Sequence, residues 1–397
     1  MKKIAIYTPN LLFSVGGAHA FALRLGNEIC KLYPDYNLDF VTDFNEKIFN
    51  EEEHKKRFNE KYNLNLTTNA NIKVICTKKK SSLFSKLIFQ RKLHKMSKNY
   101  DLFINAFHNV HFFYGKINVH LVHFPSKQRV LGSPTLKKYP FLYPIMKKYD
   151  KKYSSTYHLY ICNSKFTQNW LHKYWNIPQE KSSVLYPAIE PIAKKYHFDF
   201  DKKENTILLL SRISPEKEIL PLVEKFIENQ TLLTNYKLII AGNCPNYSKS
   251  SINYLEKIKK ITKNNNSIEL KINLSWDEIS TLIGKSKFFW HGMGFSVNET
   301  EDPLHLEHFG MTTVEAMTAG VIPIVINKGG QKEIVDNGEN GYTWNTLDEL
   351  IEKTVSLIDD NVKAKEMSEK AKLKSEQYCI NSFSENLKNI INDYNLL

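Results

Sequence analysis

Two glutamates stand eight positions apart and flank a glycine in the run Glu-His-Phe-Gly-Met-Thr-Thr-Val-Glu, residues 307–315. A glycine turn that leads into a helix presents free backbone amides, and such a helix start attracts anions. We expect Glu307 to lie on the loop before the turn and Glu315 to lie one turn inside the helix. Their carboxylates can then accept hydrogen bonds from sugar hydroxyls, so the run predicts a site for an anion and a sugar.

The same run has a structural alternative. Thr312 and Glu315 have the spacing of a capping box, in which Glu315 only satisfies a backbone amide at the helix start. Taken alone, this spacing favours the cap, because capping is its commoner role. The choice between cap and site therefore depends on motifs elsewhere in the chain.

Histidines supply further candidates. His123 lies in the run Leu-Val-His-Phe-Pro, residues 121–125, at a predicted strand end, where a histidine that faces a cleft can contact a sugar or an acceptor. A lone histidine on an apolar strand is as readily structural, so both interpretations stay open. His291 begins the loop before the two-glutamate run and is expected to line a sugar pocket. Weaker candidates are His108, His111 and His120.

Short apolar runs alternate with helical patterns along the chain, which is typical of doubly wound parallel sheets. The first series predicts strands at 3–8, 38–42, 72–76, 102–106, 119–124 and 159–162, with helices at 18–33 and 83–96. The second predicts strands at 206–213, 237–241, 268–272, 288–291 and 321–326, with helices at 220–229, 252–262 and 276–283. The tail is expected to be helical over 349–359 and 361–394.

A segment with two prolines, residues 186–191, and a polar stretch, residues 194–205, separate the two series. We therefore predict an α/β protein with two Rossmann-like domains that face each other across a cleft. The first covers residues 1–190 and the second residues 191–379, and a C-terminal helix over 380–397 is expected to pack back on the first. Open parallel sheets bind ligands beyond the carboxyl ends of their strands.

The composition narrows the class of protein. The chain has 397 residues, a net charge of +13 and five cysteines, none of them in a Cys-x-x-Cys pair. This argues against a disulfide framework and a zinc site. We expect no signal peptide and no membrane-spanning helix, and hence a cytoplasmic protein.

The positive charge indicates an anionic partner, although solubility alone can account for it. Lysines mix with aromatic residues over 136–152, and basic clusters recur at 55–57, 78–80 and 91–92. This composition is typical of a surface that rests on anionic lipid. The alternative is a solvated face above core aromatics.

The two-glutamate run resembles the Glu-x7-Glu signature of family 4 retaining glycosyltransferases, which have the GT-B fold. Ser211–Lys217 resembles the Arg-x4-Lys element that follows the first strand of their second domain, and Gly329, Gly330 and Glu333 continue the family order. In the first domain, Gly16-Gly17 and the run 162–167 fall at the corresponding strand-to-helix junctions. The ordered motifs together are far more specific than any one of them.

The resemblance implies roles for individual residues. Arg212 and Lys217 would clamp the diphosphate of a nucleotide-sugar donor, whose negative charge grows as the glycosidic bond breaks. Glu315 would hold the ribose. Glu307 would hold the transferred sugar, together with the backbone around Phe309, Gly310, Met311 and Thr312.

In the first domain, the resemblance gives His123 a contact to the transferred sugar. Gly16 and Gly17 would let the backbone approach phosphates or the acceptor, and their alternative is an ordinary strand-to-helix turn. Asp199 and Asp201 resemble the Asp-x-Asp metal motif of the other large glycosyltransferase fold. They lie in the charged stretch between domains, so we expect no metal site and no cofactor, with the Arg–Lys clamp in its place.

The predicted function is transfer of a hexose from a nucleoside diphosphate sugar, with retention, to a saccharide or lipid-linked oligosaccharide. The sequence is similar to GDP-mannose-dependent mannosyltransferases and to bacterial surface-polysaccharide enzymes, and it favours mannose. The expected partners are a nucleotide sugar, a glycan acceptor and an anionic membrane surface on the cytoplasmic side. A sugar-nucleotide epimerase of the same fold is one alternative, and a nucleic-acid-binding protein, suggested by charge alone, is another.

Overall fold

The computed structural model describes residues 2–11, 16–44, 49–62, 64, 66, 70–76, 83–107, 113–127, 141, 143, 144, 148, 155–192, 196, 199–245 and 248–397. The chain forms two compact units. Unit 1 contains Met1–Ala188 and Phe383–Leu397, and unit 2 contains Ile189–Ser382. Among the described residues, no helix has both the length and the apolar character needed to cross a bilayer.

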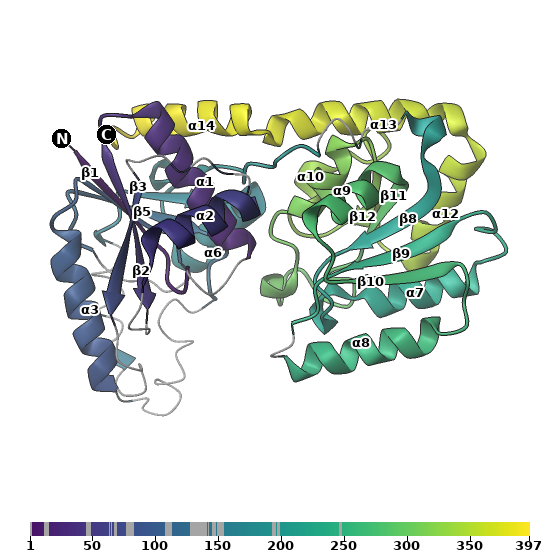
Figure 1. Cartoon of the computed structure of the whole chain (residues 1–397), viewed down its shortest axis with the longest axis horizontal. Helices are drawn as coiled ribbons and strands as arrows, with labels where there is room; N and C mark the ends of the chain where they lie inside the picture. The colour runs from purple at the N-terminus through teal and green to yellow at the C-terminus, as the bar shows by residue number, and fades with distance from the viewer. Residues whose placement is uncertain are drawn as a thin grey trace. The chain divides into compact units, whose positions relative to one another are not determined.

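Unit 1 is built on a seven-stranded sheet in the order β3-β2-β1-β4-β5-β6-β7, with every neighbouring pair parallel (Figure 1). Its strands are β1 (Lys3–Tyr7), β2 (Asn37–Phe44), β3 (Ala70–Cys76), β4 (Leu102–Asn105), β5 (Ile117–Val122), β6 (Leu159–Cys162) and β7 (Ser182–Val184). Among the described residues before Ala188, its helices are α1 (Gly17–Leu32), α2 (Glu51–Tyr62), α3 (Leu83–Ser97), α6 (Lys165–Trp175) and the short 3₁₀ helix η2 (Gln179–Lys181).

Burial explains why the inner strands of unit 1 read as continuous apolar runs. Ile4, Ala5 and Ile6 of β1 are fully buried, because β1 lies in the middle of the sheet and helices cover parallel sheets on both faces. The C-terminal segment from Phe383 belongs to this unit, and the Phe383 ring packs edge-on against Phe21 of α1, with centroids 6.0 Å apart.

Unit 2 repeats the same plan with a six-stranded parallel sheet in the order β10-β9-β8-β11-β12-β13. Its strands are β8 (Glu204–Leu210), β9 (Lys237–Gly242), β10 (Ile268–Ile272), β11 (Ser286–His291), β12 (Ile322–Ile326) and β13 (Tyr342–Trp344). Its helices are α7 (Ile219–Glu228), α8 (Lys249–Thr262), α9 (Trp276–Lys285), α10 (Met311–Thr318), α11 (Gln331–Ile334), α12 (Leu347–Asp359) and α13 (Asn361–Ser375), with 3₁₀ helices η4 (Phe200–Lys202), η5 (Pro215–Lys217), η6 (Pro303–His305) and η7 (Glu376–Tyr378).

The strand order, read from one edge, is the doubly wound arrangement in which the direction of strand addition reverses beside the first strand. The predicted fold class, α/β with two Rossmann-like units, is therefore confirmed. Strands β7 and β13 were not predicted, because three residues carry too little pattern to separate a strand from a loop.

The tail is helical, as predicted over 361–394, and it is interrupted just before the position from which a separate C-terminal helix was expected, residue 380. It divides into α13, η7 and α14 (Ile380–Asp393). At the break, Cys379 has an extended backbone and forms an isolated parallel bridge with Ile189, whose amide donates to the carbonyl of Tyr378 at 2.8 Å. Pairing with Ile189, which is distant in the chain, thus takes the place of helical hydrogen bonds at this point.

Candidate active site in the second unit

The site residues of unit 2 lie beyond the carboxyl ends of its central strands. Lys217 ends η5, the short helix that follows β8, and His291 ends β11. Strands β8 and β11 are neighbours in the sheet, so the segments that follow them emerge side by side. Glu307 lies on the long connection between β11 and α10. The sheet order therefore brings together residues that are far apart in the sequence.

The side chains of Lys217 and His291 both contact the Glu307 carboxylate. Its Oε2 accepts a hydrogen bond from Lys217 Nζ at 2.7 Å and lies 3.3 Å from His291 Nε2. Lys217 Nζ also contacts the Met293 sulfur at 3.1 Å. The side chains of Lys217 and Glu307 are 17% and 21% exposed, so the ion pair is sheltered but still open to a ligand.

The charges of this cluster are strongly coupled. Burial alone would raise the pKa of Glu307, but the Lys217 ammonium and the hydrogen bond from His291 act against it and hold the pKa well below its usual range. Burial lowers the pKa of His291, while Glu307 acts in the opposite direction. We therefore describe the cluster at neutral pH as a carboxylate held by an ammonium and a neutral imidazole.

Helix α10 begins at Met311, with Gly310 as its N-cap at φ 117°. This left-handed conformation favours glycine, and no side chain caps the helix. The capping-box alternative for Thr312 and Glu315 is therefore wrong: Thr312 already lies inside the helix, and Glu315 is its fifth residue. The first amides that donate within the helix are those of Thr313 and Val314, which bond to the Gly310 carbonyl. The amides of Met311 and Thr312 come before them, so this end can receive an anion.

Gly329 and Gly330 pack against the backbone of Glu307 and His308. Gly330 N donates to the Glu307 carbonyl at 2.8 Å. A methyl group added to Gly329, which has φ 62°, would lie 2.4 Å from the Glu307 carbonyl oxygen. A methyl group on Gly330 would lie 2.4 Å from the carbonyl oxygen of His308. Glycine is thus required at both positions by close backbone approach.

The other predicted site residues of unit 2 are more dispersed. The Arg212 side chain is 58% exposed, and its ion pair with Glu216, at 3.9 Å, is weak. Phe309 is buried, and its ring packs edge-on against Tyr378, with centroids 5.3 Å apart, so only its backbone can serve a ligand. The structure therefore brings Lys217, Glu307 and His291 into contact, and leaves Arg212 as a largely exposed cation on the segment between β8 and η5.

The Asp-x-Asp pair does not form a shared site. Asp199 pairs with Lys202 at 2.9 Å, and Asp201 pairs with Lys365 at 2.6 Å. Both carboxylates are more than half exposed. Among the residues that the structure describes, no group of three or more His, Cys, Asp or Glu side chains is arranged to hold a metal ion.

In unit 1, Gly16 is the N-cap of α1 and is exposed, and His123 is a buried residue that directly follows β5. The His123 ring packs edge-on against Phe21, with centroids 6.1 Å apart. His120 lies inside the sheet, stacked on Tyr157 and Trp175, which is a structural role. His108, His111 and nearly all of the basic segment 136–152 lie outside the described residues.

Sequence reasoning missed several residues around the site. Met293 contacts Lys217, and Lys328 binds the loop that carries Met293. The Gln331 amide is fully buried beside Gly310. A lysine directly before the Gly-Gly pair was the available signal for Lys328, but sequence alone could not tell its bonds from those of a solvated charge.

Comparisons with known proteins show what the chain resembles. Residues 193–374 match the family model described as glycosyl transferases group 1. The chain is 25% identical over 256 residues to a GDP-Man:Man(3)GlcNAc(2)-PP-Dol alpha-1,2-mannosyltransferase of Dictyostelium discoideum, covering 61% of this chain and 48% of that enzyme. It is 24% identical over 289 residues to the alpha-1,3/1,6-mannosyltransferase ALG2 of Saccharomyces cerevisiae, covering 64% of this chain and 56% of that enzyme. The chain thus spans about half the length of these two relatives.

Solved structures establish the fold. The Anabaena protein Alr3699/HepE, crystallised with UDP-glucose, superposes with a TM-score of 0.69 at 17% identity, covering 99% of this chain and 100% of that one. WaaG, a glycosyltransferase of lipopolysaccharide biosynthesis, superposes with a TM-score of 0.63 at 13% identity, covering 98% and 99%. The chain has the GT-B fold, and its sequence resembles glycosyltransferases that include GDP-mannose-dependent mannosyltransferases.

Proposed function

We propose that this chain is a retaining glycosyltransferase that moves a hexose from a nucleoside diphosphate sugar to a saccharide acceptor. The observation that carries the proposal is the contact of Lys217, Glu307 and His291 beside the glycine-started end of α10. A cation, a carboxylate and free helix amides in one place suit a donor that combines phosphates with sugar hydroxyls.

In the proposed reaction, the glycosidic bond breaks and the diphosphate leaves with its electron pair. Lys217, Arg212 and the α10 amides stabilise the negative charge that develops on the phosphates. Glu307 and His291 hold the sugar, and Glu315 holds the ribose. The oxygen of the incoming hydroxyl forms the new bond to the anomeric carbon on the face from which the diphosphate leaves, and the departing phosphate takes the proton of that hydroxyl. The protein then mainly orients the reactants.

The similarity to mannosyltransferases supports GDP-mannose as the donor and a lipid-linked oligosaccharide as the acceptor. The structural similarity to a protein crystallised with UDP-glucose supports testing that donor beside it. We also propose that the reaction needs no metal ion, because Lys217 and Arg212 supply the positive charge that a divalent ion would bring to the phosphates.

A thermal-shift screen with GDP-mannose, UDP-glucose, GDP and UDP tests the donor, because a ligand that binds the folded state raises its apparent stability. The preferred donor, labelled in its sugar, should then yield a labelled glycan in excess chelator. An isomerised nucleotide sugar without acceptor product would favour the epimerase alternative. Full turnover by the Arg212→Ala, Lys217→Ala double variant would contradict the clamp.

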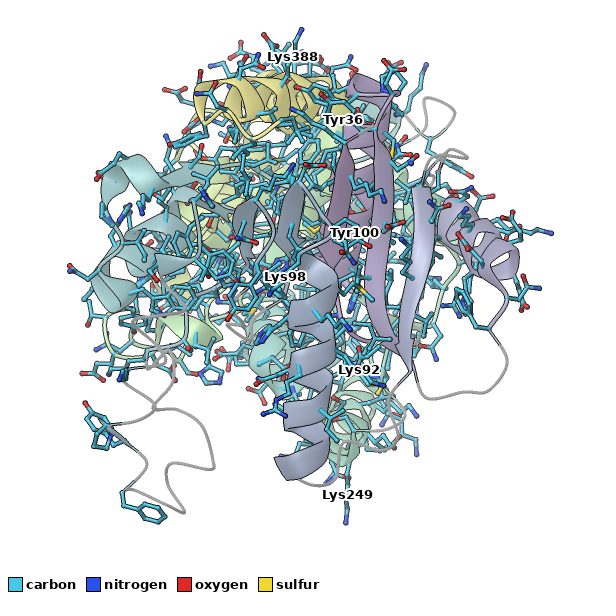
Figure 2. All side chains as sticks on the ribbon, turned by 90° about the vertical axis from the view of Figure 1, so that its left-hand side faces the viewer. Tyr36, Lys92, Lys98, Tyr100, Lys249 and Lys388 are labelled. Carbon is cyan, nitrogen blue, oxygen red and sulfur yellow. The ribbon has the colours of Figure 1, made fainter. Side chains whose placement is uncertain are left out.

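A membrane partner is supported by the surface of α3. Arg91, Lys92, Lys95 and Lys98 are exposed, and no acidic residue occurs between Leu83 and Lys98. Figure 2 looks onto this helix, with Lys92 on it and Lys98 just beyond its end. Ile88, 41% exposed, adds an apolar side chain to the same surface. Cationic and apolar groups together suit an anionic lipid headgroup layer.

Cosedimentation with phosphatidylglycerol vesicles tests this contact. Neutralising Arg91, Lys92 and Lys95 to glutamine should weaken partitioning about a hundredfold, since each such charge contributes about 1 kcal/mol near an anionic surface. The control neutralises Lys257, Lys259 and Lys260 of α8, which are also exposed but stand beside Glu256. Equal losses in both variants, or tighter binding to duplex DNA than to vesicles, would overturn the lipid assignment.

A further inference from the structure

Lys328 makes an unusual set of bonds in unit 2. It follows β12, and its Nζ donates to three backbone carbonyls, those of Gly294 at 2.9 Å, Phe295 at 2.9 Å and Val297 at 2.7 Å. An ammonium group has three donors, so this loop takes all of them. Three carbonyls of one short loop therefore converge on one side chain.

The bonds of Lys328 order a loop that has no regular secondary structure. Within residues 292–297, Phe295 N donates to the Gly292 carbonyl at 3.0 Å, and Val297 N donates to the Gly294 carbonyl at 3.1 Å. Each bond closes a tight turn. A single hydrogen bond only partly offsets the conformational entropy lost when a turn is ordered, so each turn is weakly stable by itself. The Lys328 ammonium bonds to carbonyls of both turns, so the two turns stabilise each other.

The loop contacts the site on its other side. Met293 lies 3.1 Å from Lys217 Nζ through its sulfur. Glu218, the residue after Lys217, accepts a hydrogen bond from Ser296 N at 3.0 Å and one from the Ser296 hydroxyl. The position of Lys217 is thus tied to the position of the loop.

Lys328 also belongs to the segment that supports Glu307. The next two residues are Gly329 and Gly330, which lie against the backbone of Glu307 and His308, with the bond from Gly330 N to the Glu307 carbonyl. Glu307 in turn accepts from Lys217. Lys217 and Glu307 are therefore connected in two ways: directly by their ion pair, and indirectly through loop 292–297, Lys328 and the Gly329-Gly330 segment.

We propose that Lys328 is a positioning residue of the donor site, which fixes the separation of Lys217 and Glu307 by holding loop 292–297 against the Gly329-Gly330 segment. Lys328 itself touches no substrate. This inference rests on the proposed function, in which Lys217 and Glu307 both bind the nucleoside diphosphate sugar. A misplacement of about 1 Å at such a site can cost about a hundredfold in rate.

The first test needs no substrate. In Lys328→Met, the amides of Phe295, Ser296 and Val297 should exchange with deuterium at least about tenfold faster than in the parent protein, because the loop opens locally. The matched control is Lys353→Met, which removes a part-buried lysine that donates to the Thr343 carbonyl at 2.6 Å elsewhere in unit 2. Unchanged exchange in the loop, or equal acceleration throughout unit 2, overturns the inference and leaves the proposed function intact.

The second test measures donor turnover with GDP-mannose and UDP-glucose. Lys328→Met should lower kcat by about tenfold to a hundredfold with a smaller change in KM, since binding survives while geometry relaxes. Lys328→Arg, which keeps a cation with several donors, should recover part of kcat, and Lys353→Met should match the parent protein. Faster loop exchange with unchanged kcat overturns the positioning role. If the parent protein binds neither these donors nor any other nucleotide sugar, the proposed function itself fails.

Discussion

Helices α1 and α10 both begin after a glycine, but the two helix starts are built differently. Gly16 has an ordinary extended backbone with φ −127°, and an added methyl group would meet nothing within 4 Å among the described residues. Gly310 has φ 117°, and an added methyl group would lie 2.7 Å from Gln331 Nε2. One glycine is tolerated, whereas the other is required by backbone conformation and by packing.

The difference teaches where a site can be held rigidly. Around Gly310, the fully buried Gln331, the Gly329-Gly330 segment and Glu307 fix the loop before α10. A helix start so constrained can present amides to a ligand without reorganising. The start of α1 lacks such contacts among the described residues, so we expect it to contribute less to rate and to stability.

Removing the cation should have the largest effect. Lys217→Ala takes away the charge beside Glu307 and the proposed phosphate contact, so we expect donor turnover to fall about a thousandfold. Nucleotide release from the preferred donor measures the rate, and circular dichroism checks that the fold is kept. A loss below about tenfold is no more than an exposed ion pair contributes. It would show that the Lys217 site is no more important for turnover than the start of α1.

Gly310→Ala should have the next largest effect. The left-handed backbone and the contact with buried Gln331 predict a loss of about 1–3 kcal/mol in the free energy of unfolding, with displaced α10 amides and lower turnover. Urea denaturation and donor turnover measure the two consequences. Parent-like stability and rate would show that the loop before α10 adapts freely.

Acid should weaken the Glu307 cluster. A carboxyl with a lower pKa in the folded than in the unfolded chain stabilises the fold above the unfolded value, and this contribution is lost as pH falls through the folded value. At neutral pH, the free energy of unfolding of the parent protein should exceed that of Glu307→Gln by about 2 kcal/mol, the typical contribution of hydrogen bonds to a charged group. This difference should shrink as the pH falls below 4.5.

Urea denaturation across this pH range measures the difference. Glu301→Gln, on the exposed turn before η6, serves as the control for loss of a carboxylate from the same connection. If Glu307→Gln and the parent protein keep a constant difference down to low pH, the coupling of Glu307 to Lys217 is weaker than the geometry indicates.

The smallest effect should come from Gly16→Ala. Because Gly16 has an extended backbone and open surroundings, we expect a change below about 1 kcal/mol in the free energy of unfolding. The same urea measurement as for Gly310→Ala gives the direct comparison. A large loss of turnover with unchanged stability would instead reveal a ligand role for Gly16, as the resemblance predicted.

The sequence by itself determined the alternation of strands and helices, the two-part α/β plan, and the segments on which a site could lie. These features depend on local pattern: buried parallel strands require unbroken apolar runs, and Gly310 before a helix has few alternatives. It also identified Glu307, Lys217 and His291 as candidates, because they stand in or beside an ordered set of motifs that resembles a glycosyltransferase family.

Only the tertiary structure decided which of these residues meet. Lys217 and Glu307 are 90 positions apart, and the adjacency of β8 and β11 brings them to 2.7 Å. The same folding rejected the cap at Thr312 and gave Lys328 its three carbonyls. Each of these outcomes depends on a partner distant in the chain, and a local pattern contains no information about such a partner.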